Sequence, residues 1–333
     1  MAIRLATCLV VLHLVLAASA ASGASAASAA EPTRFCITAD NRGATGYMTV
    51  LKSLASVPGG PGAFLISNGD QDPARVTRNQ IDAVLGPALP WYPVVGNHEL
   101  KKLVSFWATS EIQYLRDHYI AHLAGKVNPG PEGTRETTYS FNAGDVHIAI
   151  LNEYWNGGTQ PESDRKGGGQ VIAPLREWLK KDLQGSHKPW KLVVGHPPAF
   201  PQPDRDWGTG RHNIDVAAAL NVSREQVVRN PFWMMLEAQG VAAYLCAHTH
   251  LYSRFQPPGS KVWQIDAAQA RSNKDWKYDA FIIVTADAQS LKFEIYRNLE
   301  EQGKFTITDH LTLTAAGAAG SPAAGQPGLR PPN

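Results

Sequence analysis

Short apolar runs that end in a polar cluster recur along the chain. Five of them climb through hydrophobic residues and then reach Asp, Asn or His: RFCITAD (34–40), AFLISNGD (63–70), WYPVVGNHE (91–99), WKLVVGH (190–196) and VAAYLCAHTH (241–250). Apolar runs of this length, bounded by turn-forming residues, are typical of buried strands. The pattern predicts five strands that present polar groups at one edge.

The segments between these runs predict the fold class. Residues 46–56 and 74–86 carry apolar positions at helical spacing, which predicts βαβ units and a mainly parallel sheet in the N-terminal half. Two later segments, 136–152 and 281–297, have the pattern of hairpins, with turns around Asn142–Asp145 and near Asp287. We therefore expect an α/β sandwich with ligands at the carboxyl ends of the strands.

The two ends of the chain do not resemble parts of a folded domain. Residues 5–18 form an apolar core after Arg4, followed by small-residue sites, which predicts a secretory signal peptide over 1–26. This core is too short for a membrane span. The Ala/Gly/Pro-rich residues 315–333 predict a disordered tail. A single domain over 31–314 and export from the cell, to a secreted or periplasmic location, are the resulting expectations.

Composition narrows the partners. The chain has 31 basic and 29 acidic residues, a net charge of +2, so there is no electrostatic case for binding nucleic acid or an anionic membrane. With the signal removed, two cysteines remain, Cys36 and Cys246. They form either two buried thiols or one bridge, and their apolar strand context favours thiols.

The polar clusters have the chemistry of a metal site. Each alone has a structural explanation: Asp40 as a helix cap, His196 as a core histidine, the Asn97–Glu99 stretch as an ordinary turn. Together, five strand ends would have to point such groups in one direction by accident. His248 and His250, two residues apart, face the same side of an extended chain. Imidazole, carboxylate and amide oxygen suit zinc, iron or manganese better than calcium.

The order of these motifs resembles the calcineurin-like metallophosphoesterase superfamily, which includes the purple acid phosphatases. The residues that carry the resemblance are Asp40, Gly69–Asp70, Gly96–Asn97–His98–Glu99, Gly195–His196 and His248–x–His250. It implies a four-layer α/β/β/α sandwich of two mixed sheets flanked by helices, and two metal ions. By this match Asp70 would bridge both ions. Asp40 and His250 would hold the first ion, and Asn97, His196 and His248 the second.

The residue types agree with that chemistry. Two cations about 3.5–4 Å apart lower the pKa of a trapped water and clamp the phosphoryl oxygens, so that the resulting metal-bound hydroxide attacks in line. His98, next to Asn97, is expected to protonate the leaving alkoxide as general acid, unless it is purely structural. Glu99 is expected to orient the His98 imidazole or to raise its basicity.

Two positions depart from the family pattern. Arg42 stands where the family most often has a histidine, and Pro73 stands where purple acid phosphatases usually supply a tyrosine. The first ion would then keep three protein ligands, a workable set with lower affinity. Arg42 has three interpretations: a phosphate clamp, a salt bridge with Asp72, or a cation that replaces the first metal. A guanidinium beside a metal ion is repelled unless an anion lies between them, which favours the clamp.

Two long Gly/Pro-rich loops, 153–170 and 198–230, are predicted to select the substrate. Aromatic, basic and imidazole side chains in them either contact a leaving group or pin the loops: Tyr154, Trp155, Arg205, Trp207, Arg211 and His212.

The sequence therefore predicts a metal-dependent phosphoesterase that acts on phosphomonoesters or diesters, with Arg42 and Asn97 as substrate-binding residues. The alternative is a weakened member of the superfamily that keeps one metal as a binding or structural module. A zinc peptidase is excluded because the chain lacks the His-Glu-x-x-His pair.

Overall fold

A computed structural model of the protein describes residues 31–100, 110–123, 125–134, 136–158, 169–200, 202–204, 208–209, 214, 230–272, 278–300 and 303–315. The predicted signal peptide and residues 316–333 of the predicted tail lie outside these ranges. The helices and strands belong to one compact unit that begins at Pro32. Within the described ranges, no helix combines the length and the hydropathy needed to cross a membrane.

The first sheet is mixed and has the strand order β15-β14-β13-β1-β2-β3. Its strands are β1 (Thr33–Thr38), β2 (Leu65–Ser67), β3 (Trp91–Pro93), β13 (Ala280–Ala286), β14 (Ser290–Arg297) and β15 (Thr306–Thr314). β1, β2 and β3 are parallel, and their crossovers are α1 (Tyr47–Ser56) and α2 (Ala74–Leu85). β13 pairs antiparallel with β1, and β14 and β15 continue as an antiparallel meander.

The second sheet is also mixed and has the order β11-β12-β10-β7-β6-β5-β4. Its strands are β4 (Asn128–Pro129), β5 (Tyr139–Ala143), β6 (Val146–Ile150), β7 (Trp190–Val194), β10 (Ala243–Cys246), β11 (Tyr252–Phe255) and β12 (Trp263–Ala267). β6, β7, β10 and β12 are parallel, so their carboxyl ends lie at one edge. The short strands β8 (Pro203–Asp204) and β9 (Gly208–Thr209) form a separate pair.

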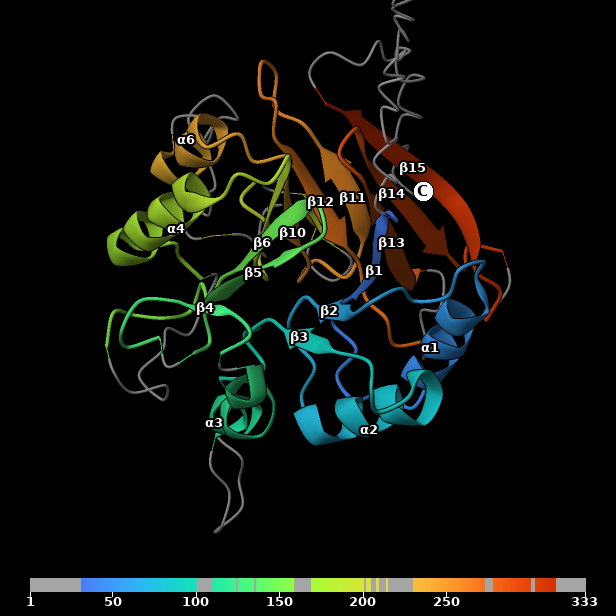
Figure 1. Ribbon diagram of the computed structural model, residues 1–333. Coiled ribbons are helices and arrows are strands. Elements are labelled where there is room, and N and C mark those ends of the chain that lie inside the picture. Colours follow the sequence, from blue (N-terminus) through green and yellow to red (C-terminus); the bar gives the residue numbers. More distant parts are fainter. Residues whose placement is uncertain are drawn as a thin grey trace, which may run out of the picture. The chain divides into compact units, whose positions relative to one another are not determined.

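The remaining helices follow β3 in the chain. α3 (Glu111–Leu115), the π-helical turn η1 (Arg116–Ile120) and the 3-10 turn η2 (Ala121–Leu123) follow one another directly. α4 (Ala173–Gly185) precedes β7, and α6 (Pro231–Ala238) precedes β10. Figure 1 shows α4 and α6 together on one side of the second sheet, and α1 and α2 together beside the first.

Side-chain alternation along the strands builds two cores. On β6, Ile148 and Ile150 belong to the core shared by the two sheets, whereas Ala149 belongs to the core under α4 and α6. β7 repeats this pattern, because Leu192 and Val194 face the first core. Both faces of the second sheet are therefore buried, which is why its parallel strands read as continuous apolar runs. The predicted four-layer sandwich of two mixed sheets is confirmed.

The predicted elements match the structure closely at the N-terminal half. Helices predicted over 46–56 and 74–86 form α1 and α2, and both predicted hairpins form, as β5–β6 and β13–β14. The sequence did not predict the strands β4, β8, β9, β11, β12 and β15. Cys36 and Cys246 are free and buried, as the interpretation in favour of thiols expects, and burial raises the pKa of both.

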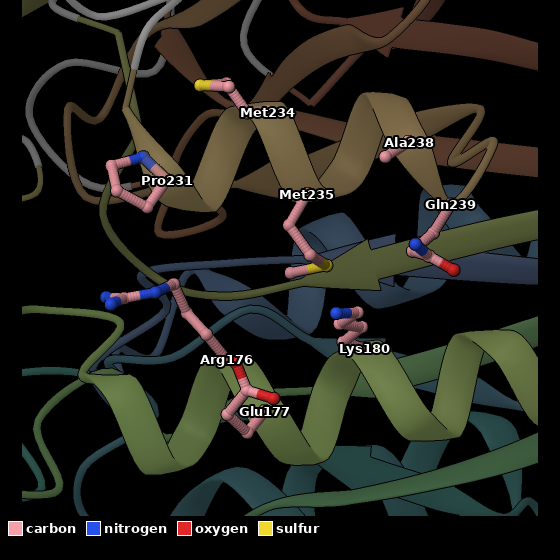
Figure 2. A pocket seen from close by; sticks show the side chains of 8 residues that line it. All are labelled: Arg176, Glu177, Lys180, Pro231, Met234, Met235, Ala238 and Gln239. Atoms are coloured by element: carbon pink, nitrogen blue, oxygen red, sulfur yellow. The ribbon is translucent and has the colours of Figure 1, made fainter.

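A groove of about 340 Å³ lies between α4 and α6, the two helices that cover the second sheet. Figure 2 shows its lining, with Arg176 and Lys180 from α4 and Met235 from α6. None of the predicted site residues lines this groove. The site has to be sought at the strand ends.

Candidate metal centre

The carboxyl ends of five strands bring the predicted residues together. Asp40 follows β1, Asp70 follows β2 and the Asn97–His98 pair follows β3, while His196 follows β7 and the two histidines of His248-x-His250 follow β10. Backbone hydrogen bonds tie the first two turns together: the Asp40 amide donates to the Gly69 carbonyl (3.1 Å) and the Arg42 amide to the Asp70 carbonyl (3.0 Å). The site thus spans both sheets.

The backbone at these turns is strained. Asp40, Asp70, His248 and His250 all have positive φ, at 49°, 53°, 75° and 62°. A non-glycine residue in this left-handed region costs about 1–3 kcal/mol, and such residues cluster at functional sites. At each of these residues the backbone turns sharply after the strand, so that the side chain points at the neighbouring strand ends.

Two overlapping sets of side chains have the spacing of metal ligands. The His196 group consists of Asp70, His196 and His248, and the His250 group consists of Asp40, Asp70 and His250. In each group one potential ligand atom per residue lies within 4.8 Å of the others. Asp70 is the member that both groups share, as expected for the bridging carboxylate.

The His196 group fits a metal ion closely. His196 Nε2 lies 3.2 Å from His248 Nδ1 and 3.5 Å from Asp70 Oδ1. Tetrahedral ligands at about 2.0–2.1 Å from an ion lie about 3.3 Å apart. His196 Nδ1 donates to the Asn68 carbonyl at 2.6 Å, which fixes the tautomer and leaves the Nε2 lone pair directed at the group.

An unpartnered buried oxygen adds to this fit. Asn97 Oδ1 is buried and has no hydrogen-bond partner in the described part of the chain. Unpartnered buried oxygens are rare and require an explanation, and an ion in the His196 group supplies one. Burial raises the pKa of the Asp40 carboxyl, but the imidazoles of His250 and His196 and the Arg271 guanidinium outweigh it and hold that pKa below its usual range.

Glu99 lies elsewhere than the sequence predicts. Its carboxylate does not contact the His98 imidazole; it accepts the backbone N–H groups of Gly96 (2.6 Å), Asp70 (3.0 Å) and Gln71 (2.9 Å). Burial and the nearby carboxylates of Asp70 and Asp72 raise the pKa of Glu99 well above its usual range, whereas the backbone donors act against that rise. Glu99 therefore holds the β2 and β3 turns in register, and its role at His98 stays a prediction.

Glu153, which the sequence analysis missed as a site residue, does the same for the β7 turn. Its Oε2 accepts the His196 backbone N–H (2.7 Å) and its Oε1 accepts the Tyr244 hydroxyl (2.6 Å). Burial raises the pKa of Glu153 to about 8. Its signal was present, because the run HIAILNE (147–153) also climbs through apolar residues to an acid.

Glycines next to the ligands leave room for these contacts. A Cβ on Gly96 would lie 2.3 Å from Asp70 Oδ1 and 2.4 Å from the Asp70 amide nitrogen. A Cβ on Gly195 would lie 2.4 Å from Glu153 Oε2. Gly69 has a φ of +86°, and a Cβ there would meet His196 Nδ1 at 2.4 Å. Close approach, as well as the tight turn, requires glycine at these positions.

Gly96→Ala should therefore displace Asp70 and release bound metal. We expect metal content after dialysis to fall by more than about tenfold, since moving even an outer-shell contact lowers affinity about 10–100-fold. Gly185→Ala is the matched control, because a Cβ at Gly185 meets nothing within 4 Å. Elemental analysis of both variants makes the comparison, and equal metal content in the two would contradict the close approach.

Comparison with known proteins now decides the family. A sequence model of the calcineurin-like phosphoesterases matches residues 34–252. The chain belongs to the calcineurin-like phosphoesterase family. No curated protein matches it in sequence.

Solved structures are similar to this family member at low sequence identity. PhoD is 12% identical, with a TM-score of 0.54 over 86% of this chain and 70% of PhoD. GAP50, described as the anchor in the inner membrane complex of Plasmodium, is 11% identical, with a TM-score of 0.48 over 86% of this chain and 89% of GAP50. The similarity to PhoD supports the fold assignment and gives no information about the substrate of this chain.

Arg42, the departure from the family pattern, lies at the edge of the centre. Its Nε pairs with Asp72 Oδ1 at 2.8 Å, and its Nη1 lies 2.7 Å from His98 Nε2. A guanidinium only donates, so His98 Nε2 accepts and the imidazole proton lies on Nδ1, 3.7 Å from Asp72 Oδ2. The salt-bridge interpretation thus describes the Nε side. On its other side His98 lies near Asp70, with Nε2 3.6 Å from Asp70 Oδ2.

Arg271 is a second arginine at the centre, which the sequence analysis missed. It follows β12, with its Nε donating to the Asp40 carbonyl (2.6 Å) and its Nη2 3.1 Å from His250 Nε2. The polar residue that ends the β12 run, Asp266, is fully buried and accepts from Thr249 (2.9 Å), and burial raises its pKa to about 8. The run VWQIDA (262–267) was thus the missed signal for a further strand end.

The described parts of the predicted specificity loops are anchored to the body. Tyr154 is fully buried, and Trp155 is 3% exposed with its indole N–H donating to the Gly158 carbonyl (2.7 Å). For these two residues the pinning interpretation holds. The other predicted contacts, Arg205, Trp207, Arg211 and His212, lie outside the described residues.

Proposed function

We propose that this protein is an exported, metal-dependent phosphoesterase that hydrolyses small phosphomonoesters and, with lower preference, phosphodiesters. The single observation that carries the proposal is the convergence of the His196 group, His98 and two arginines at one edge of the sandwich. This combination of metal-binding side chains and guanidinium donors suits an anionic phosphate as the substrate group. Export rests on the N-terminal sequence pattern.

The chain's own residues divide the work. Asp70, Asn97, His196 and His248 would hold the metal, which when bound would lower the pKa of a water and polarise the phosphoryl group. Arg42 is anchored through Nε by Asp72, so that its Nη donors extend toward the centre. These donors bind the phosphoryl oxygens in pairs.

His98 gives the proton to the leaving oxygen. In the structure the Arg42 Nη1 donor binds His98 Nε2. When Arg42 turns its donors onto a phosphate, Nε2 is released to take up a proton, which it then delivers to the leaving alkoxide. Binding of the anion and readiness of the acid are thereby linked through one side chain.

Metal removal tests the proposal. We expect hydrolysis of p-nitrophenyl phosphate to stop on treatment with a chelator and to return when Zn²⁺, Mn²⁺ or Fe²⁺ is added singly.

His98→Ala should lower kcat by about 100–10,000-fold with metal content unchanged, because general-acid catalysis contributes that much. Mass spectrometry of the exported protein's N-terminus tests the signal peptide. A chain without bound metal and without activity under any ion would exclude the enzyme.

A second candidate is a metal-binding module without turnover. The observation that favours it is that guanidinium groups contact both His98 and His250, two histidines on which a full two-metal enzyme depends. Its signature would be bound metal, no hydrolysis of any phosphoester, and no effect of His98→Ala on any measured property.

A further inference from the structure

Arg271 is built into the centre by contacts at both ends. Its backbone N–H donates to Asp279 Oδ1 (3.0 Å), and its side chain reaches the Asp40 carbonyl through Nε (2.6 Å). Its backbone also lies close to the start of α1, since a Cβ on Gly46 would lie 2.1 Å from the Arg271 carbonyl oxygen. Ser272, the next residue, has a φ of 48°. The backbone next to Arg271 is therefore strained, in the turn that positions its guanidinium.

The far end of Arg271 contacts a predicted metal ligand. Its Nη2 lies 3.1 Å from His250 Nε2. His250 Nε2 in turn lies 3.4 Å from Asp40 Oδ1. Because a guanidinium stays protonated and has no acceptor, His250 Nε2 accepts this bond with the lone pair that a metal ion would need.

The two ligand groups therefore differ in their fit to an ion. His196 donates its other ring nitrogen to a carbonyl, which directs Nε2 at the His196 group. His250 Nε2 instead accepts a hydrogen bond from the positively charged Arg271 guanidinium. An ion in the His250 group would lie beside that guanidinium. Coulomb repulsion in a buried site, where screening is weak, opposes such an ion. The His196 group suits a resident metal, and the His250 group does not.

We propose that the centre holds one resident metal ion, in the His196 group, and that Arg271 takes the place of the second ion as a fixed cation beside Asp40. This inference deepens the proposed function and rests on it. Arg271 would then be a positioning residue for the substrate phosphate, with a charge that neither a chelator nor a change of pH within the working range removes.

Metal stoichiometry tests this directly. Purified protein is saturated with Mn²⁺ or Zn²⁺, dialysed, and analysed by elemental mass spectrometry and by calorimetric titration. We expect one ion per chain in the wild type. Arg271→Met should create a second site, with its affinity raised about 10–100-fold over any residual second binding in the wild type. Arg254→Met is the control. Arg254 lies on β11 and pairs with Asp309 of β15 (2.8 Å), so its loss should leave the count at one.

His250→Ala provides an independent arm that leaves Arg271 intact. In the wild-type background it should leave the count at one, whereas His248→Ala should lower it toward zero. In the Arg271→Met background the same His250→Ala change should return the count from two to one. If Arg271→Met does not fold, the single variants at 248 and 250 still decide the matter.

The outcomes separate this inference from the proposed function. Two ions of similar affinity in the wild type, with one lost in His250→Ala, would overturn the role of Arg271 and leave the phosphoesterase intact. One ion per chain without hydrolysis of p-nitrophenyl phosphate would support the role of Arg271 and count against the enzyme. No bound ion at all would overturn both.

Discussion

Replacing Asp70 with asparagine is expected to release the metal and to abolish phosphoester hydrolysis while the protein stays folded. Asp70 is the residue common to both ligand groups, and its Oδ1 lies 3.5 Å from His196 Nε2 and accepts the His98 backbone N–H at 2.9 Å. Asparagine keeps the shape and one acceptor oxygen but removes the charge that attracts the ion. Ligand loss should lower metal affinity by more than about 100-fold.

The loss of activity should be larger still. The charge stabilisation that a metal ion gives to the transition state is several kcal/mol, so hydrolysis should fall at least about 1000-fold. Elemental analysis, p-nitrophenyl phosphate turnover and thermal unfolding are the measurements. Asp82→Asn is the control, because Asp82 pairs with Arg78 on α2 (2.7 Å) outside the centre. Full metal content in Asp70→Asn would show that the ion binds elsewhere.

The positions of the ligands were predictable because their signal is local. An apolar run that ends in Asp or His needs no knowledge of the fold, and parallel strands bring such ends to one edge. Asp40, Asp70 and His196 were found in this way. The same rule, applied evenly, would have found Glu153 and the run that ends near Asp266.

What the sequence could not give are contacts between distant backbone and side-chain groups. Arg271 lies 231 residues from Asp40 in the chain, and its bond goes to a carbonyl that every residue has. No pattern of residue types encodes that bond. The same is true of Glu99, whose neighbour in sequence, His98, suggested a catalytic partnership, whereas its partners are backbone amides that carry no sequence signature.

Glu99→Ala is expected to destabilise the fold strongly, in contrast to the effect of losing a residue that only orients a catalytic acid. Three buried backbone N–H groups, of Gly96, Asp70 and Gln71, would lose their acceptor. Each buried donor left unsatisfied costs about 1–3 kcal/mol, so the free energy of unfolding should fall by about 3–5 kcal/mol even after some relaxation. The melting temperature should drop by roughly 10 °C.

A graded series isolates the cause. Glu99→Gln keeps one acceptor oxygen, so its loss of stability should lie between those of the wild type and Glu99→Ala. Glu111→Ala is the matched control: Glu111 is also a buried acid, but it accepts one backbone N–H, that of Ala74, and should cost about a third as much. Because the Glu99 carboxylate holds the amide of Asp70, metal content should fall in the same order as the melting temperature. Unchanged stability in Glu99→Gln, with an altered pH profile of kcat, would instead return Glu99 to the role at His98 that its place in the sequence suggests.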